Sequence, residues 1–179
     1  MSDVLTPDQR HRNMAAIHST STKPELKLRN ALWHHGFRYR VNDKRLPGKP
    51  DIVLPKHRTA IFVNGCFWHG HIGCKKFKLP DTNRLYWEEK IDRNRARDIN
   101  NWHNLEVQGW NVINIWECEL EKYFFQETLN RVEAEIIANG KEYRFRQEER
   151  RATNKAYREM REGQREREAE LKLEIKAIW

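Results

Sequence analysis

The sequence has no long apolar run and no apolar segment near its N-terminus. A membrane-spanning helix requires about 20 apolar residues in a row, and a secretory signal requires a shorter apolar core. Cysteine is also scarce, since the 179 residues contain only three, an odd number that argues against a disulfide framework. We therefore predict a soluble, intracellular, cytoplasmic protein without membrane contact, whose cysteines serve in metal binding or in packing.

Acidic residues are fewer than basic ones, with 26 Asp and Glu against 34 Lys and Arg and a formal net charge of +8. A basic protein favours polyanionic partners, nucleic acid first, although many solvated surfaces are basic as well. Seven tryptophans accompany this charge, and aromatic rings can stack on bases or wedge between them. The composition therefore favours a nucleic-acid-binding protein, and the chain is long enough for one domain with a sizeable core.

Apolar spacing and turn residues predict the order helix, three strands, helix, strand, helix. The expected helices cover residues 22–36, 83–108 and 120–138, and the expected strands cover residues 37–41, 51–54, 59–63 and 110–116. The last strand follows a long helix, so we expect it to run parallel to an earlier strand. The two central strands are almost wholly apolar, so we expect them to be covered on both faces. This order predicts a three-layer α/β domain.

Several details of the helices can also be predicted. Residues 22–25 read Thr-Lys-Pro-Glu, which fits a capping box. We expect Asn139-Gly140 to end the last helix of the domain. The residues expected to face the core from the helix at 83–108 are Leu85, Ile91, Ile99, Trp102 and Leu105.

Both ends of the chain differ from its middle. Thr6-Pro7-Asp8 predicts a short polar helix towards Ile17, which suits a mobile arm over residues 1–20. Residues 140–179 alternate Arg or Lys with Glu and have few apolar positions before Leu171. This tail is either a solvated helix or partly disordered segment, or a helix that lies on DNA, on a partner or on a second copy of the chain.

Cys66, His71 and Cys74 have the spacing C-x4-H-x2-C, and Cys118 follows at the end of a predicted strand. A structural zinc takes four Cys or His ligands in a tetrahedron, often several of them from one loop. The set uses every cysteine of the chain. The alternative is a group of buried thiols beside an unrelated His. A closed site of this kind would hold the loop and take no part in catalysis.

Pro50-Asp51 opens a strand hairpin, an arrangement similar to the start of the PD-(D/E)xK nuclease core. In that core the second strand supplies an acid, a spacer and a Lys, whereas residues 62–64 here are Phe-Val-Asn. A lone Asp can equally cap a turn. His69 is a candidate general base, with zinc binding or simple exposure as alternatives. Glu25 and Asp98 are further acids, but a capping box and a solvated helix surface account for them equally well.

A series of short motifs runs along residues 5–138. The motifs are Asn13-Met14, Glu25, Leu46 to Asp51, Gly65 to His69, His71, Cys74, Gly109-Trp110 and Trp116 to Cys118. This set resembles the very short patch repair (Vsr-type) T:G mismatch endonucleases, bacterial enzymes that nick DNA at mismatches left when 5-methylcytosine deaminates. The resemblance implies a restriction-endonuclease-like core with a central mixed sheet at residues 21–139. It also implies a DNA-binding arm at residues 1–20 and a charged tail at residues 140–179.

The resemblance implies a role for each matching residue of the cutting site. Asp51 would bind a catalytic Mg2+, assisted by the backbone carbonyl of Val63. His69 would activate the attacking water, and Glu25 and Asp98 would position water molecules or that base.

Other matching residues would serve zinc and DNA. The implied zinc ligands are Cys66, His71, Cys74 and Cys118. The implied DNA contacts are Phe67, Trp68 and Trp87 from the major groove and Met14 from the minor groove, with core packing as the alternative for Trp87. Wedging suits a mismatched step, because it is cheaper to unstack than a paired one. The implied partners of a monomeric, nucleoid-associated enzyme are T:G-mismatched double-stranded DNA, a MutL-type protein and a repair polymerase.

Three features depart from the family pattern. Asn64 stands where a family member has a His that contacts the scissile phosphate. We expect Asn64 to serve in catalysis as a neutral hydrogen-bond donor. The interval from His71 to Cys74 is one residue longer than expected. The tail after Gly140 has no counterpart.

The resemblance implies a Mg-dependent, strand-specific endodeoxyribonuclease that nicks 5′ of the thymine in T:G mismatches and so initiates very short patch repair. One alternative is a related sequence-specific nuclease that acts on matched duplex. The other is a zinc-stabilised DNA-binding module without catalysis, for which Asn64 is the only hint. The joint presence of Asp51, Glu25 and His69 favours an enzyme.

Overall fold

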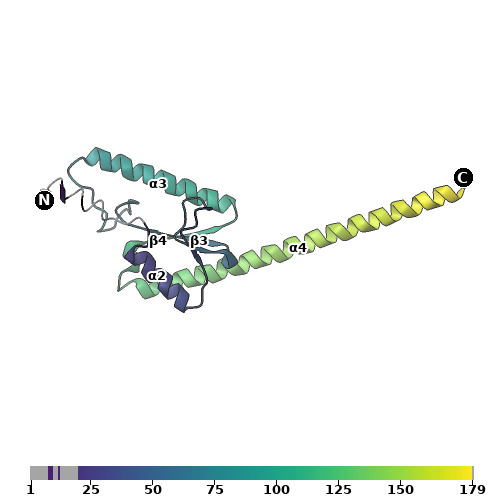
Figure 1. The fold of residues 1–179 in the computed structure, drawn as a ribbon, viewed down its shortest axis with the longest axis horizontal. Helices are drawn as coiled ribbons and strands as arrows, with labels where there is room; N and C mark the ends of the chain where they lie inside the picture. The colour runs from purple at the N-terminus through teal and green to yellow at the C-terminus, as the bar shows by residue number, and fades with distance from the viewer. Residues whose placement is uncertain (1–7, 10–11, 13–19, 179) are drawn as a thin grey trace. The chain divides into compact units, whose positions relative to one another are not determined.

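The computed structural model describes residues 8–9, 12 and 20–178, with side chains up to residue 165 and at residue 167. Its elements are α2 (Lys23–His34), β1 (Arg40–Val41), β2 (Ile52–Leu54), η1 (Pro55–His57), β3 (Thr59–Asn64), α3 (Arg84–Val107), β4 (Asn111–Trp116), η2 (Glu117–Leu120) and α4 (Phe125–Ile178) (Figure 1). Apart from the short 3-10 helices η1 and η2, this is the predicted order. Most of the helix predicted towards Ile17 lies outside the described residues, and so does Met14. Within the described part of the chain, no helix is both long and apolar enough to cross a membrane.

The strands form one mixed sheet in the order β1-β2-β3-β4. β2 pairs antiparallel with β1 and with β3, whereas β3 and β4 pair in parallel. The predicted parallel return of the last strand is confirmed, because α3 provides the crossover between β3 and β4. The strand predicted at residues 37–41 is shorter than expected, since only Arg40–Val41 pair with a neighbour.

Helices cover both faces of this sheet, as the apolar character of β2 and β3 predicts (Figure 1). α2 and the first turns of α4 pack on one face, and α3 packs on the other. The core on the α2 side contains Leu28, Leu32, Ile52, Leu54, Ile61, Ile113, Ile115, Leu120, Leu129, Val132 and Ile136. The smaller core on the α3 side contains Ala60, Phe62 and Leu105, with Leu46, Trp102, Trp110 and Val112 against them. The predicted α/β architecture with a central mixed sheet is therefore confirmed.

α2 begins and ends where the sequence predicts. Thr22 is the N-cap residue of a capping box in which the Thr22 N–H donates to Glu25 Oε1 at 3.3 Å. The helix is followed by Gly36, whose φ of +87° is accessible to glycine without strain and turns the chain towards β1. The capping box matters beyond helix stability, because it holds the Glu25 carboxylate at a defined position.

The prediction for the core face of α3 is partly wrong. Ile91 and Leu105 are buried and Trp102 packs against the smaller core, as expected. Leu85 and Ile99, however, are 77% and 62% exposed. The side of α3 that faces the fold also carries polar residues. The apolar residues alone therefore do not identify that side.

The predicted helix end at Asn139-Gly140 is also wrong, because α4 continues to Ile178. Glycine inside a helix costs only about 1 kcal/mol, and the residues that follow have high helix propensity. Gly140 instead permits a close approach, since a Cβ there would lie 2.4 Å from His57 Nδ1. By internal contacts the chain forms two compact units, residues 1–140 and residues 141–179.

Leu32 tests the larger core. Replacing a fully buried Leu by Ala removes apolar contacts and leaves a cavity, so Leu32→Ala should lower the free energy of unfolding by about 2–5 kcal/mol. Leu26→Ala on the same helix is the control, because Leu26 is 45% exposed and should cost less than about 1 kcal/mol. Urea denaturation followed by circular dichroism measures both values, and equal costs would contradict this assignment of the core.

Candidate active site and metal centre

The parallel pairing of β3 and β4 brings two candidate metal ligands together. Asn64 and Trp116 are register partners at the ends of these strands. Two residues further along, the chain reaches Cys66 in one case and Cys118 in the other. The loop after β3 then folds back, with the His71 N–H donating to the Cys66 carbonyl at 2.9 Å. Strand register and one loop turn thus place the ligands of the predicted zinc site.

The four predicted zinc ligands form one cluster. The ligand atoms of Cys66, His71, Cys74 and Cys118 all lie within 4.8 Å of one another. His71 Nδ1 lies 3.4 Å from the Sγ atoms of Cys66 and Cys118. A tetrahedral zinc with Zn–S bonds of about 2.3 Å holds its ligand atoms roughly 3.8 Å apart. The spacing therefore fits zinc, and the cluster suggests a structural zinc site.

The surroundings of this cluster also suit a metal centre. The His71 ring stacks on Trp116, with centroids 4.2 Å apart and planes inclined by 2°. Burial raises the pKa of the Cys66 thiol to about 12, whereas the backbone N–H of Lys76 lowers the pKa of Cys74. The three cysteines are free of disulfides although their sulfur atoms are close neighbours. Unrelated buried thiols would not require a His ring between two sulfur atoms, so the arrangement favours a metal site.

A cavity of about 780 Å³ is lined in part by the loop after β3. The residues predicted for the cutting site all line it, and they are Glu25, Asp51, Val63, Asn64, His69 and Asp98. They come from α2, the start of β2, β3, the following loop and α3. The fold therefore gathers in one place side chains that lie far apart in the sequence.

Asp51 stands directly before β2 and faces β3. Its Oδ2 accepts a hydrogen bond from the Val63 N–H at 2.8 Å. Burial raises the pKa of Asp51 to about 6 against the effect of that hydrogen bond, and the nearby Glu25 raises it further. A carboxylate whose charge is poorly solvated gains from a bound cation, and Mg2+ prefers oxygen ligands. Asp51 therefore fits a magnesium ligand.

Glu25 is held firmly beside Asp51. Its carboxylate accepts hydrogen bonds from the Ser21 N–H at 2.9 Å, from the Thr22 hydroxyl at 2.8 Å and from Arg29 Nη2 at 2.9 Å. Arg29 is buried, and its Nη2 also donates to the Asp51 carbonyl at 3.0 Å. Both carboxylate oxygens of Glu25 are thus engaged within the protein, which suits a positioning role better than direct binding of a metal.

His69 and Asp98 form a close pair. His69 Nδ1 lies 2.5 Å from Asp98 Oδ2. An ionised carboxylate can only accept a hydrogen bond, which makes Nδ1–H the donor of this contact, and a neutral imidazole bonded in this way has its lone pair on Nε2. His69 is absent from the cluster of Cys66, His71, Cys74 and Cys118. The geometry therefore suits a general base oriented by Asp98, and it removes the interpretation of Asp98 as a solvated surface residue.

Asn64 lines the cavity from the end of β3. The residue is 4% exposed, and its buried Nδ2 has no hydrogen-bond partner among the described residues. A buried donor without an acceptor costs free energy, so such a group calls for a reason. An anionic oxygen in the cavity would satisfy it.

α3 fixes the loop that separates the cavity from the cysteine cluster. Asn94 Nδ2 donates to the Trp68 carbonyl at 2.9 Å, and Arg95 Nη2 donates to the Gly70 carbonyl. Gly70 has a φ of +65°, and a Cβ there would lie 2.6 Å from Ile91 Cγ2. Only glycine fits so close to the helix, and the loop conformation depends on it.

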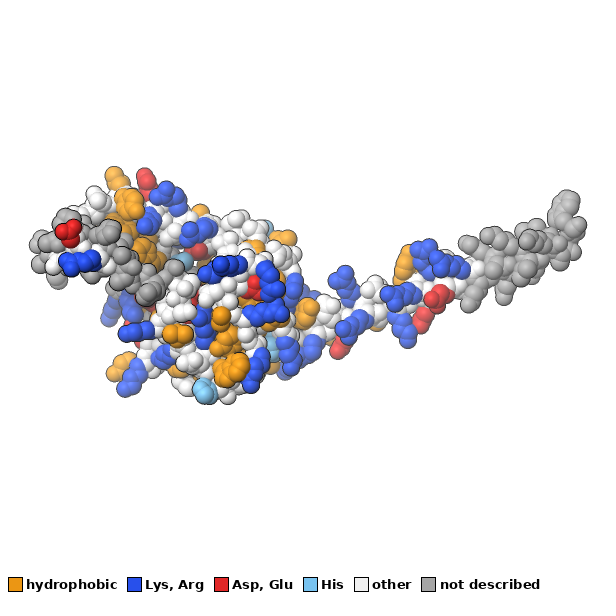
Figure 2. Space-filling model, in the orientation of Figure 1, with side chains coloured by type: hydrophobic (Ala, Val, Ile, Leu, Met, Phe, Trp, Pro, Cys, Tyr) orange, Lys and Arg blue, Asp and Glu red, His pale blue; other side chains and the backbone are white. Residues whose placement is uncertain are grey.

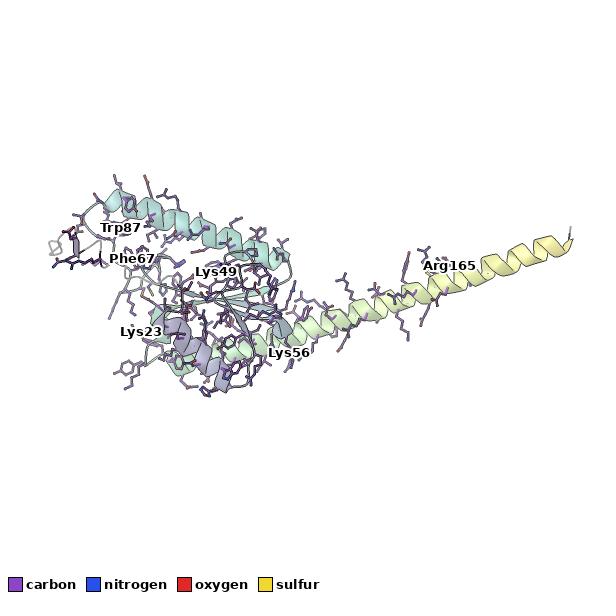
Figure 3. The ribbon with its side chains drawn as sticks, in the orientation of Figure 1. Lys23, Lys49, Lys56, Phe67, Trp87 and Arg165 are labelled. Carbon is purple, nitrogen blue, oxygen red and sulfur yellow. The ribbon has the colours of Figure 1, made fainter. Side chains whose placement is uncertain are left out.

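Phe67, Trp68 and Trp87 form an aromatic cluster. Phe67 and Trp87 lie together at one end of the fold, with ring centroids 5.4 Å apart (Figure 3). The Trp68 centroid lies 5.2 Å from Phe67 and 6.1 Å from Trp87. All three rings remain partly exposed, and neither core cluster of the described residues includes Trp87. Core packing therefore does not account for Trp87.

Three residues that organise the site were not predicted. Arg29 follows Glu25 by four residues on α2, a spacing that favours an ion pair and is a usable signal. Asn94 and Arg95 lie about one helical turn after Ile91 and so share its inward side. Because their neighbours in the sequence are charged or polar, this part of α3 looks like a solvent-exposed surface. The sequence therefore does not show that Asn94 and Arg95 face inward.

Comparisons with known proteins identify the family of the chain. Residues 2–76 match the family model described as DNA mismatch endonuclease Vsr. The type II nicking enzyme V.NmeAIP of Neisseria meningitidis serogroup A is 50% identical over 137 residues, which is 76% of this chain and 97% of that protein. The type II nicking enzyme V.XorIIP of Xanthomonas oryzae pv. oryzae is 46% identical over 120 residues, 67% of this chain and 88% of that protein. The DNA mismatch endonuclease Vsr of Escherichia coli strain K12 is 40% identical over 143 residues, 78% of this chain and 91% of that protein.

These similarities confirm the predicted enzyme class, a DNA nicking endonuclease. The α/β fold and the cavity with its candidate base and carboxylates are consistent with that class. Within the class, the chain belongs to the Vsr family of DNA mismatch endonucleases.

The cysteine cluster is tested by replacing its only histidine. His71→Asn should reduce bound zinc from about one ion per chain to well below half, and it should lower the thermal midpoint of unfolding, because metal binding and folding are coupled. His103→Asn is the matched control, since His103 is exposed and outside the cluster. Zinc is measured by elemental analysis of purified protein, and full zinc content in His71→Asn would overturn the ligand set.

Proposed function

We propose that this enzyme nicks duplex DNA 5′ of the thymine in T:G mismatches and so initiates very short patch repair. The main support is that the His69–Asp98 pair and the Asp51 carboxylate line one cavity. We also propose that the core is a PD-(D/E)xK-like variant. Its hairpin keeps the first acid, Asp51, while Phe62 and Asn64 stand where a second acid and a Lys are expected.

Asp51 and the backbone carbonyl of Val63 are the proposed holders of Mg2+. When bound, Mg2+ would offset the negative charge that develops on the scissile phosphate. The Val63 N–H fixes the orientation of the Asp51 carboxylate, and Arg29 ties the Asp51 carbonyl to α2. Glu25 shares that Arg29 contact and adds negative charge beside Asp51, which favours a cation in the cavity.

His69 is the proposed general base. Its Nδ1 donates to Asp98, so its Nε2 can take a proton from the attacking water as the water adds to phosphorus. The P–O bond to the leaving strand breaks in the same displacement, and solvent water protonates the leaving oxygen. Asp98 then stabilises the positive imidazolium ring that results. The pair keeps its orientation because the loop around His69 is bonded to α3 through Asn94 and Arg95.

Asn64 is the proposed donor to the scissile phosphate. Its buried Nδ2 has no acceptor among the described residues, and a phosphate oxygen would supply one. Because an amide is neutral, it positions the phosphate but contributes less charge stabilisation than a protonated His would.

Phe67, Trp68 and Trp87 are the proposed wedge at the mismatch. The three rings contact one another and stay partly exposed, as expected of a preformed surface for stacking. A T:G step is cheaper to unstack than a paired step, so a fixed wedge would select the mismatch through the energy of deformation. Met14 remains a proposed minor-groove contact and lies outside the described residues.

A second candidate is sequence-specific nicking of matched duplex. The relatives from Neisseria and Xanthomonas are named type II nicking enzymes, without reference to a mismatch. The cavity would serve that reaction equally, since the chemistry at phosphorus is the same. The division into a DNA-binding arm at residues 1–20, an endonuclease domain at 21–139 and a tail at 140–179 stays a proposal, as do a MutL-type partner, a repair polymerase and a monomeric state.

One pair of duplexes decides between these candidates. The two substrates differ by a single base, so that one contains T:G and the other T:A, and both strands carry end labels. With Mg2+ present we expect a nick 5′ of the mismatched thymine at a rate roughly 100-fold above that of the matched duplex, because unstacking a mismatch saves a few kcal/mol. Equal cutting would favour the matched-duplex candidate, and tight binding without a nick would favour the binding module.

Asp51→Asn tests the cutting site itself. Loss of the buried carboxylate should lower the single-turnover nicking rate at least about 100-fold, as removal of an electrostatic group from a reaction centre does. Urea denaturation without Mg2+ should show stability equal to or above that of the unsubstituted protein, because burying the Asp51 charge is costly. Asp81→Asn changes an exposed aspartate and should leave both measurements unaltered. Nicking by Asp51→Asn at the normal rate would refute the assignment.

A further inference from the structure

Between Glu142 and Arg161, α4 carries its charges on two separate sides. Between Glu142 and Arg161 the chain has seven basic and four acidic residues. Successive residues of an α-helix lie about 100° apart round its axis, and on that spacing the basic residues occupy about half of the circumference. The acidic residues occupy the other half. We call the first side the basic face, and it consists of Arg144, Arg146, Arg150, Arg151, Lys155, Arg158 and Arg161.

Every side chain of the basic face is exposed. Lys and Arg side chains are visible along this part of α4 in Figure 2. Two of them have an ion pair within the described part of the chain, Arg146 with Glu142 at 3.4 Å and Lys155 with Glu159 at 3.7 Å. Most of the positive charge on the basic face is therefore not neutralised by α4 itself.

Like charges are close neighbours along the basic face. Opposite charges three or four residues apart stabilise a helix in water, whereas like charges at that spacing destabilise it. A helix that serves only as a solvated spacer would interleave the two signs on every side. The basic pairs at this spacing are Arg146 and Arg150, Arg151 and Lys155, Lys155 and Arg158, and Arg158 and Arg161. Such a pattern is expected where an anionic partner meets one side of the helix.

We propose that the basic face binds the sugar–phosphate backbone of duplex DNA, independently of base sequence and in addition to the contacts at the cutting site. All but Lys155 are arginines, whose planar guanidinium groups suit phosphate oxygens. From Arg144 to Arg161 the helix rises about 26 Å, and duplex DNA carries one negative charge per roughly 1.7 Å of its axis. The face is therefore long enough to meet several phosphates at once.

A second copy of the chain fits this segment less well. The acidic side bears Phe145 and Met160, which are 61% and 50% exposed, and between them only Ala152 and Ala156 provide apolar positions. A coiled-coil seam requires a large apolar residue about twice per heptad. Pairing through that side would also leave most residues of the basic face without an ion-pair partner on the protein. Charge complementarity therefore selects DNA as the occupant.

These contacts would add the same affinity for duplex DNA whether or not the duplex contains a mismatch. Backbone contacts of this kind displace counterions, so they strengthen binding to any duplex and weaken steeply as salt rises. The segment would keep the enzyme on DNA while the cutting site meets successive base pairs.

Two matched triple variants of the full chain test the proposal. Arg150→Gln, Arg151→Gln and Arg158→Gln neutralise the basic face, while Glu148→Gln, Glu149→Gln and Glu159→Gln neutralise the opposite side over the same turns. Gln has a helix propensity close to those of Arg and Glu, and circular dichroism checks the helix content. Fluorescence anisotropy measures Kd for a labelled, fully matched 40-base-pair duplex between 50 and 200 mM NaCl without Mg2+.

The basic-face variant should bind at least about 30-fold more weakly at 100 mM NaCl, and its slope of log Kd against log salt should fall by about 2 to 3. The acidic-side variant should bind as tightly as the unsubstituted protein or more tightly. Arg150→Lys, Arg151→Lys and Arg158→Lys keep the charge and should retain most of the slope, which separates lost charge from lost helix.

An unchanged affinity and slope in the basic-face variant would overturn the proposal. So would a change of oligomeric state in analytical ultracentrifugation with DNA binding intact, since the face would then join two chains. The single-turnover nicking rate at saturating enzyme should be the same in all variants, because none of these residues lies in the cavity. A failure of this proposal is therefore distinguishable from a failure of the proposed mismatch specificity.

Discussion

Parallel hydrogen bonding between β3 and β4 aligns Asn64 with Trp116, and both the cysteine cluster and the cavity depend on that register. Cys66 and Cys118 are neighbours because each follows its strand end by two residues. A slip of one residue would turn every side chain of a strand to the other face and separate these ligands. The same alignment leaves Asn64 at the edge of the cavity, so one strand pair positions both the cysteine cluster and the candidate cutting site.

The loop after β3 contributes residues to both the cysteine cluster and the cavity. Cys66, His71 and Cys74 fix one side of the loop, while hydrogen bonds from Asn94 and Arg95 fix the other. A side chain held between two anchored segments has few accessible orientations. Little conformational entropy is therefore lost when substrate binds. A structural zinc at the cysteine cluster would support the proposed reaction through this rigidity and would need no open coordination position.

The cavity is maintained against the ordinary preference for apolar interiors. Glu25, Arg29 and Asp51 lie within or beside the core, and the burial of Asp51 raises its pKa. Arg29 offsets part of that cost by bonding both to Glu25 and to the Asp51 carbonyl. The inward side of α3 is polar at Asn94 and Asp98 for the same reason, which is why Leu85 and Ile99 do not lie inside. Stability is given up locally so that charged groups can meet substrate.

The sequence by itself determined the order of the elements, the capping box at Thr22 and the set of four zinc-type ligands, because each depends on neighbours in the chain or on residue chemistry. The pairing of His69 with Asp98, the buried role of Arg29 and the packing of Trp87 against Phe67 were decided by tertiary structure alone. Each of those contacts joins elements whose relative placement depends on the whole sheet and the loop that crosses it. The continuation of α4 past Gly140 could likewise not be predicted from the sequence. A glycine inside a helix costs too little free energy to end the helix when the residues on both sides favour it.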